Sequence, residues 1–221
     1  MQVMQQKALE DLLSLYRIFA SDIDRRIEEF LLLWREASEH RLFMEAVFCL
    51  FTPQSKAKNC WRAVLDLEER GLLYRGSPRE VASCIRGLVR FHNTKARRLE
   101  GLRALFAPNG VPKVRERVLE MGRNPKKCRD ALSRQVSGYG LKEASHFLRN
   151  VGYSLDLAIV DRHILKNLAD MGIIKVIPKV ISRKVYMNVE EKFAGLADAL
   201  GLSVAQLDLL LWAKQTGYVF K

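Results

Sequence analysis

The chain has 221 residues, 48% hydrophobic and 28% charged, which is enough to bury a substantial core in one domain or two joined lobes. Its 37 Lys and Arg against 25 Asp and Glu give a net charge of +12, which favours a polyanionic partner such as nucleic acid over an acidic one. A membrane span is excluded, because no apolar run reaches about 18 residues. The first seven residues also lack a secretory signal, so we expect an intracellular protein.

Cysteine and histidine spacing gives no indication of a metal centre. The four cysteines lie 11, 24 and 44 residues apart, unlike zinc or iron–sulfur ligands, and the histidines are equally scattered. We therefore expect free, mostly buried thiols, no metal and no cofactor. The residues concerned are Cys49, Cys60, Cys84 and Cys128, with His40, His92, His146 and His163.

Apolar residues recur with a helical period almost throughout, so the predicted fold class is all-α. Asp22 or Asp24 is expected to cap a second helix after residues 8–20. Three capping boxes are expected to start helices, at Ser77–Glu80, Asn188–Glu191 and Ser203–Gln206. Only residues 173–186 look extended. Further helices are predicted at about residues 41–51, 55–70, 112–121, 162–171 and 204–216.

The turn Ser137-Gly138-Tyr139-Gly140-Leu141-Lys142 lies between two helical runs. Gly138 and Gly140 permit positive φ and leave the backbone open to close approach. Their N–H groups lie at a helix start, where the dipole favours negative charge. The turn therefore predicts a helix-hairpin-helix that binds phosphate and holds Lys142 beside it.

Asp161 follows Lys142 by nineteen residues and reads as the N-cap of the next helix. A lysine amine is nucleophilic only when neutral, and the positive end of a helix dipole favours the neutral form. An ionised Asp161 across a cleft would stabilise positive charge on a sugar ring at C1′. The alternatives are an exposed helix lysine or a plain phosphate contact for Lys142, and a plain cap for Asp161.

The segments Gly138 to Gly152 and Ile159 to Leu165 closely resemble the helix-hairpin-helix DNA glycosylase superfamily. Within it they resemble the type 2 8-oxoguanine DNA glycosylase/AP lyases, as do Arg90 to Ala96 and Leu211 to Lys221. The matching segments span about residues 85–221, whereas residues 1–40 match no motif.

This resemblance implies a bifunctional DNA repair enzyme acting on a nucleotide flipped out of duplex DNA. Lys142 would attack C1′ and expel the oxidised base with support from Asp161. The Schiff base would then undergo β-elimination. No metal or redox cofactor is implied, and the absent cysteine cluster separates the chain from iron–sulfur glycosylases that act on oxidised pyrimidines.

The base pocket needs a hydrogen-bond acceptor, because the 8-oxo form of guanine carries a proton at N7. Trp212 is a candidate for stacking on the base or, alternatively, for core packing. His146 is expected to support the pocket, and the segment ending at Lys221 to close it.

DNA contacts are expected from the basic segment after residue 89. Phe91, with Arg90, is predicted to wedge into the gap left by the flipped base, the alternative being a buried helix end. Phosphate contacts are predicted for Lys95, Arg97 and Arg98.

We expect two helical lobes with the site in the cleft between them. One lobe would comprise residues 41–150, and the other would combine residues 1–40 and 151–221. A monomer in the cytoplasm, associated with the nucleoid through DNA, is the expected form. Two alternatives stay open, namely a related glycosylase for another oxidised base such as a pyrimidine, and a non-catalytic helix-hairpin-helix DNA-binding protein.

Overall fold

All regular structure in the computed structural model is helical. The structure describes residues 2–221, with side chains from Lys7 onward, and within this range it contains twelve α-helices, one 3-10 turn and no strand. The predicted all-α class is confirmed. The elements are α1 (Gln2–Glu36), α2 (Glu39–Phe51), α3 (Ala57–Glu69), α4 (Leu72–Arg75), α5 (Pro78–Ile85), α6 (His92–Phe106), η1 (Pro108–Gly110), α7 (Val114–Glu120), α8 (Pro125–Gln135), α9 (Leu141–Asn150), α10 (Arg162–Asp170), α11 (Arg183–Leu200) and α12 (Val204–Thr216).

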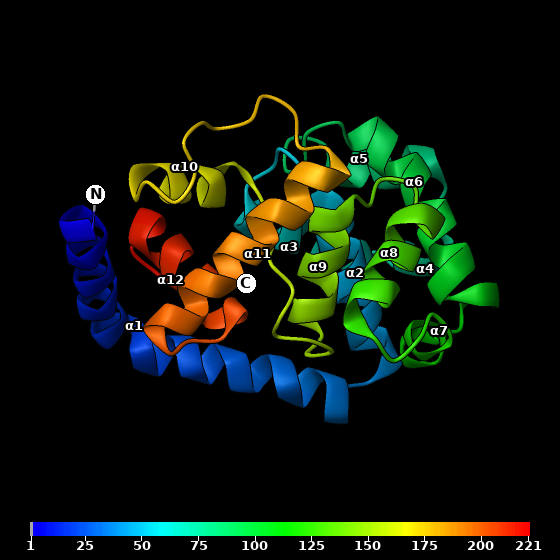
Figure 1. Cartoon of the computed structure of the whole chain (residues 1–221). Helices are drawn as coiled ribbons and strands as arrows, with labels where there is room; N and C mark the ends of the chain where they lie inside the picture. The colour runs from blue at the N-terminus through cyan, green and yellow to red at the C-terminus, as the bar shows by residue number, and fades with distance from the viewer. Residues whose placement is uncertain (1) are drawn as a thin grey trace.

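Helix α1 is continuous over 35 residues, so the predicted break at Asp22 or Asp24 is wrong. Neither carboxylate caps a helix. Asp22 forms an i,i+3 ion pair with Arg25 at 2.6 Å, and Asp24 accepts hydrogen bonds from Tyr16 and, at 2.9 Å, from Gln206 of α12. Figure 1 shows the first part of α1 along the left edge of the molecule and the second part along the lower edge, so this continuous helix changes direction as it passes α12.

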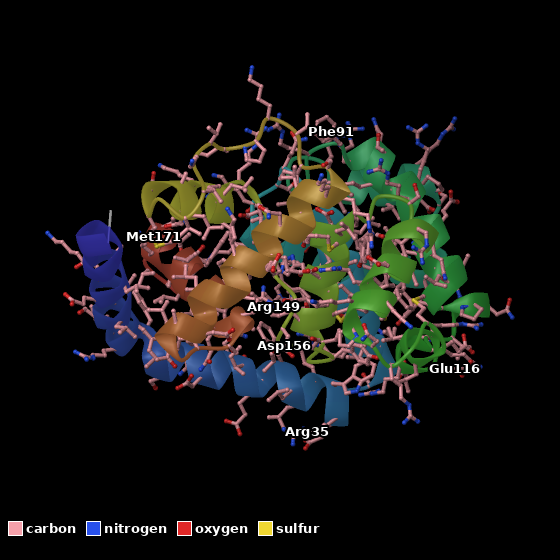
Figure 2. The ribbon with its side chains drawn as sticks, viewed as in Figure 1. Arg35, Phe91, Glu116, Arg149, Asp156 and Met171 are labelled. Atoms are coloured by element: carbon pink, nitrogen blue, oxygen red, sulfur yellow. The ribbon has the colours of Figure 1, made fainter. Side chains whose placement is uncertain are left out.

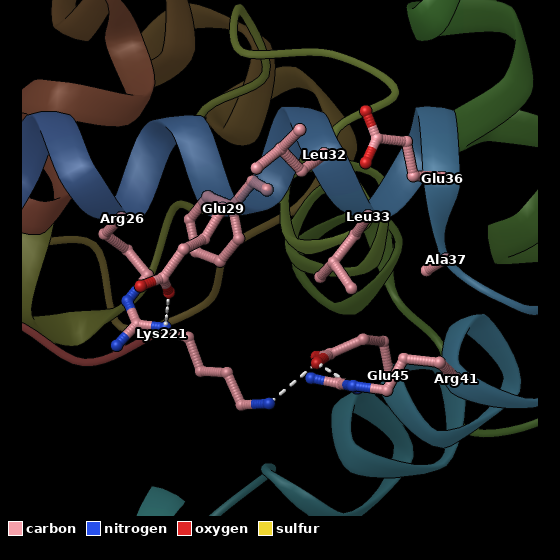
Figure 3. A pocket seen from close by; sticks show the side chains of 10 residues that line it. Arg26, Glu29, Leu32, Leu33, Glu36, Ala37, Arg41, Glu45 and Lys221 are labelled. Carbon is pink, nitrogen blue, oxygen red and sulfur yellow. Dashed lines mark hydrogen bonds and ion pairs between the residues drawn. The ribbon is translucent and has the colours of Figure 1, made fainter.

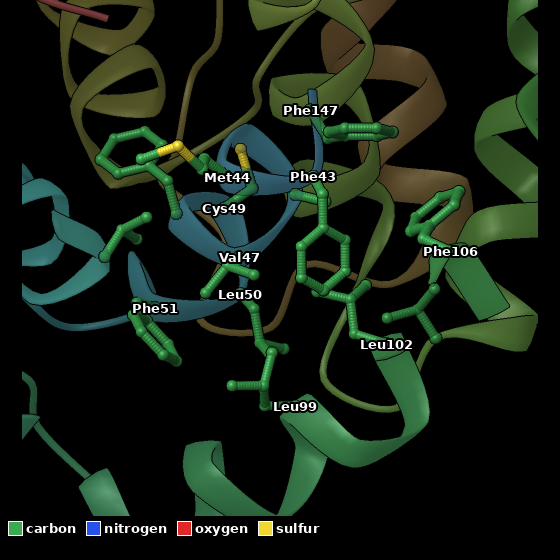
Figure 4. Close-up of a cluster of buried hydrophobic side chains, with 14 of the residues drawn as sticks. Phe43, Met44, Val47, Cys49, Leu50, Phe51, Leu99, Leu102, Phe106 and Phe147 are labelled. Atoms are coloured by element: carbon green, nitrogen blue, oxygen red, sulfur yellow. The ribbon is translucent and has the colours of Figure 1, made fainter. Parts of the chain in front are cut away.

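The buried hydrophobic residues form two clusters. One runs from Leu42 to Leu157 and contains the aromatic centre drawn in Figure 4, with Phe43, Phe106 and Phe147. The other joins Leu12, Ile23 and Phe30 of α1 to residues between Ala158 and Leu211. We propose that these clusters correspond to the two predicted lobes, residues 41–150 and residues 1–40 plus 151–221. Their composition supports that division, which stays a prediction.

Two capping predictions are confirmed and a third is wrong. Ser77 with Glu80 and Ser203 with Gln206 form complete capping boxes at the starts of α5 and α12. The box predicted at Asn188–Glu191 lies inside α11, which begins at Arg183 with Ser182 as its N-cap. Consequently only residues 173–182 of the segment predicted as extended lack helical structure.

No single helix among residues 2–221 combines the length and hydropathy of a membrane span. Helices α11 and α12 have the required length and hydropathy only when the two are taken together, and a 91° bend lies between them.

Candidate active site

The hairpin joins α8 to α9 and needs a glycine at its centre. Gly138 has a φ of +96°, and a Cβ there would lie 2.6 Å from Cδ of Arg98. Gly140 is the N-cap of α9, and its N–H donates to Oε2 of Glu143 at 3.0 Å. A phosphate at this position would therefore compete with the Glu143 carboxylate for the N–H of Gly140. Tyr139 is buried and donates its hydroxyl to the carbonyl of Ala46 at 2.7 Å, which fixes the hairpin against α2.

Lys142 and Asp161 line the same cavity, which has a volume of about 1040 Å³. Lys142 is the second residue of α9, its side chain is 25% exposed, and its ammonium lies 3.5 Å from Oε1 of Glu143. Asp161 is the N-cap of α10, as predicted. Its Oδ1 accepts from the N–H groups of His163 at 2.8 Å and Ile164 at 2.9 Å. Both side chains are thus held at helix N-termini.

Helix α12 supplies part of the cavity wall and carries an acid that was not predicted as a site residue from the sequence. Asp208 and Trp212 are four residues apart, which places them on one face of the helix, and both line the cavity. Burial raises the pKa of Asp208 to about 6, although Arg149, whose Nη1 is 3.5 Å away, acts in the opposite direction. The available clue was a single acid in an otherwise apolar run, Leu207 to Leu211.

Trp212 presents a polar group with no protein partner. Its indole Nε1 is buried and makes no hydrogen bond within the described part of the chain. The ring meets His163 edge-on at 6.2 Å between centroids. A half-buried indole on the cavity wall favours the stacking role over pure core packing.

His146 also lines the cavity and is nearly fully buried. Burial, reinforced by the positive charges of Arg149 and Lys142, lowers its pKa well below the usual value, so the imidazole is neutral at pH 7. Neither ring nitrogen has a hydrogen-bond partner among residues 2–221, and the ring packs edge-on against Phe48.

Lys221 is held at the cavity wall by a buried carboxylate. Its ammonium donates to Oε1 of Glu45 at 2.7 Å and lies 3.1 Å from the ring centroid of Trp61. Burial lowers the pKa of Lys221 to about 8, against the opposing effect of Glu45. Lys221 also lines a second cavity of about 390 Å³, shown in Figure 3.

Phe91 is exposed and lies in a left-handed backbone conformation. Its φ is +56° and its side chain is 55% exposed, so the alternative of a buried helix end is wrong. The adjacent Arg90 lines the cavity, and its N–H donates to Oγ of Ser55 at 3.0 Å. The wedge role of Phe91 stays a prediction.

Lys95 is a correction to the sequence-based prediction. Its side chain is buried, and its ammonium donates to the carbonyls of Phe51 and Pro53, both at 2.7 Å, and to Oγ of Ser55 at 3.1 Å. Burial lowers its pKa to about 8. Lys95 therefore ties the turn after α2 to α6 and is not placed to contact a phosphate. Arg97 is exposed and Arg98 half-buried, and their phosphate contacts stay predictions.

No group of three or more His, Cys, Asp or Glu side chains within the described range is arranged to hold a metal ion.

The hairpin, the lysine–aspartate pair and the aromatic wall together define a helix-hairpin-helix protein of the DNA glycosylase class. A family model described as 8-oxoguanine DNA glycosylase matches residues 23–202. The chain belongs to this 8-oxoguanine DNA glycosylase family.

Relatives and solved structures match this chain over nearly its whole length. The chain is 35% identical to an 8-oxoguanine DNA glycosylase/AP lyase of Fusobacterium nucleatum, covering 94% of both chains. The crystal structure of the 8-oxoguanine DNA glycosylase of Thermotoga maritima matches with a TM-score of 0.85 and 33% identity, covering 98% of this chain and 100% of that one. The Methanocaldococcus jannaschii 8-oxoguanine glycosylase/lyase, solved with a 15mer DNA containing 8-oxoguanine, matches with a TM-score of 0.84 and 32% identity over 100% of both chains.

Proposed function

We propose that this enzyme excises 8-oxoguanine from duplex DNA and then cleaves the strand at the resulting site. The observation that carries the proposal is that Lys142 and Asp161, each held at a helix N-terminus, line one cavity beside the hairpin. The Fusobacterium relative is named as a glycosylase/AP lyase, and the Methanocaldococcus protein was crystallised with the lesion DNA, which supports the same substrate here.

The glycosylase step begins when the damaged nucleotide is extruded into the cavity. The lone pair of Lys142 Nζ forms a bond to C1′, while the bond from C1′ to the base breaks and the base leaves with that electron pair and takes up a proton. Positive charge develops on the sugar as this bond breaks. The Asp161 carboxylate stabilises it from a fixed position, since the two cap hydrogen bonds hold the side chain in place.

The lyase step uses the same covalent intermediate. Opening of the sugar ring converts the amine adduct to a Schiff base between Lys142 and C1′. Loss of a proton from C2′ and departure of the 3′ phosphate then break the strand by β-elimination. Hydrolysis of the imine releases Lys142.

Base recognition follows from the wall formed by α12. Trp212 offers a stacking face, and Asp208, one helical turn away, offers a carboxylate to accept the N7–H that distinguishes 8-oxoguanine from guanine. Two of the acids that line the cavity are already bound to backbone N–H groups, since Asp161 caps α10 through Oδ1 and Glu143 accepts from Gly140. Asp208 lines the same cavity and caps no helix. Lys221 and His146 complete the wall.

A glycosylase for an oxidised pyrimidine would use the same lysine and aspartate with a different base pocket. A non-catalytic DNA binder would use the hairpin alone and leave no role for the Lys142 and Asp161 pair.

The test is borohydride trapping on a duplex with one 8-oxoguanine opposite cytosine. Wild type is expected to form a covalent adduct, and Lys142→Gln to form none while binding the duplex normally. Lys126→Gln, which changes an exposed lysine on α8 of the same hairpin motif, is the matched control and should be trapped like wild type. If wild type binds the duplex but gives no adduct, the proposed lyase activity is wrong. Excision from a second duplex, which carries an oxidised pyrimidine, distinguishes an 8-oxoguanine glycosylase from a pyrimidine glycosylase.

A further inference from the structure

The loop between α10 and α11 exposes apolar side chains at an unusual density. Val176 is 78% exposed and Val180 76%, and Ile177 and Ile181 are also exposed. These four lie within six consecutive positions, and the two valines are more than three-quarters exposed. A solvated loop gains nothing from such residues, and clustered exposed apolar side chains mark interaction sites.

The same loop carries only positive charge. Lys175 and Lys179 each directly precede an exposed valine, and residues 171–189 contain no Asp or Glu. Arg183 pairs with Asp130 at 2.6 Å, whereas Lys175 and Lys179 are exposed side chains with no recorded ion pair within the described range. The partner that suits alternating lysine and valine is a polyanion that also presents apolar edges. The phosphates and deoxyribose rings of DNA have this combination.

The position of the loop joins it to the active-site cavity. Ile181 lines that cavity together with Lys142 and Asp161, and Arg90 lines it next to the wedge residue Phe91. In Figures 1 and 2 the loop and Phe91 lie at the same edge of the molecule. The loop is therefore continuous with the surface on which the lesion-bearing strand would lie.

We propose that residues 173–182 form a second DNA-contacting element, which rests on the proposed function in assuming that DNA enters this cavity. Lys175 and Lys179 bind backbone phosphates of the strand that carries the lesion. Val176 and Val180 pack against deoxyribose surface next to the extruded nucleotide and exclude water from the mouth of the cavity. Phe91 and this loop then hold the DNA from two sides of the site.

Two double variants of the full chain test the two kinds of contact. Binding is measured by fluorescence anisotropy on a duplex with a tetrahydrofuran abasic analogue, which is not cleaved, over a range of NaCl concentrations. Lys175→Ala/Lys179→Ala is expected to reduce the slope of log affinity against log salt by about 1.8, about 0.9 for each phosphate contact. Val176→Ser/Val180→Ser is expected to weaken binding about tenfold at every salt concentration, with the slope unchanged.

The matched control is Arg17→Ala/Ile18→Ser, an exposed basic and apolar pair on α1 outside the cavity. It should bind like wild type. All the substituted side chains are exposed, so melting temperatures should stay close to that of wild type.

The proposal is overturned if both loop variants bind with the affinity and salt slope of wild type, which would assign the loop to another partner such as an acidic protein. Failure of the proposed function gives a different result, because wild type would then form no borohydride adduct with 8-oxoguanine DNA. The salt slopes on the uncleaved duplex still report on the loop in that case.

Discussion

Lys142 and Asp161 lie at the N-terminal ends of two different helices, α9 and α10, and both line the same cavity. Helix starts favour negative charge, so one end suits an ionised aspartate and the other disfavours an additional cation. A single structural device therefore positions both the proposed nucleophile and the proposed stabilising carboxylate. Asp161 caps α10, and substitution can separate this cap from the catalytic role proposed for it.

Asp161→Ser keeps a hydroxyl that can cap α10 but removes the charge. We expect its free energy of unfolding to stay near that of wild type, while Asp161→Ala loses about 1 kcal/mol. Single-turnover excision of 8-oxoguanine should fall at least about 100-fold in both variants, because the developing positive charge loses its counter-ion. Wild-type excision by the serine variant would show that Asp161 is only a cap.

Asp208→Asn should separate base recognition from strand cleavage. Asparagine can accept from N7–H only through its amide oxygen and lacks the charge of the carboxylate, so excision of 8-oxoguanine is expected to slow about 100-fold. Borohydride trapping on a preformed abasic site should stay at the wild-type level, since no base is recognised there. An equal loss in both assays would instead assign Asp208 a structural role through Arg149.

The titration of Asp208 predicts a pH dependence of stability. Its pKa is raised from 3.8 to about 6 by burial, so the native state binds a proton more tightly than the unfolded chain. Wild type should therefore lose stability relative to Asp208→Asn as the pH rises from about 4 to about 6. This difference in pKa corresponds to a change of about 3 kcal/mol in the free energy of unfolding. Urea unfolding of both proteins between pH 3.5 and pH 7 measures it, and a constant difference would contradict the assignment.

Local patterns in the sequence predicted the parts of the site that depend on neighbouring residues. The bond from Gly140 to Glu143, the cap formed by Asp161 and the box at Ser77 each involve groups within four positions along the chain. Such patterns carry their own physical cause, which is the need to satisfy backbone groups at helix ends.

Features that depend on distant contacts were not predictable in this way. The break expected in α1 fails because Asp24 has its partner in Gln206, 182 positions away. Asp208 was not predicted as a site residue, because nothing local to it shows that α12 lines the cavity. Lys95 looked like a phosphate contact because nothing local shows that the carbonyls after α2 turn toward it.

Phe91 can be tested without disturbing the core, because its ring is exposed. Phe91→Ala removes the wedge that would fill the gap left by the flipped base, so binding of an 8-oxoguanine duplex should weaken about tenfold. Its melting temperature should stay near that of wild type. A 2-aminopurine opposite or next to the lesion, which fluoresces when unstacked, should report less base extrusion. Unchanged fluorescence and affinity would remove the wedge role.

Lys95 and Arg97, two positions apart on α6, should respond in opposite ways to substitution. Lys95→Met keeps a long side chain but leaves the carbonyls of Phe51 and Pro53 without their donor, so the free energy of unfolding should fall by about 2 kcal/mol. Arg97 is exposed, so Arg97→Ala should leave stability unchanged and lower the salt slope of DNA binding by about 0.9. Below its melting temperature Lys95→Met should keep the wild-type slope, because its ammonium bonds protein carbonyls instead of phosphate. A reduced slope for Lys95→Met at full stability would mean that this ammonium leaves its three acceptors when DNA binds.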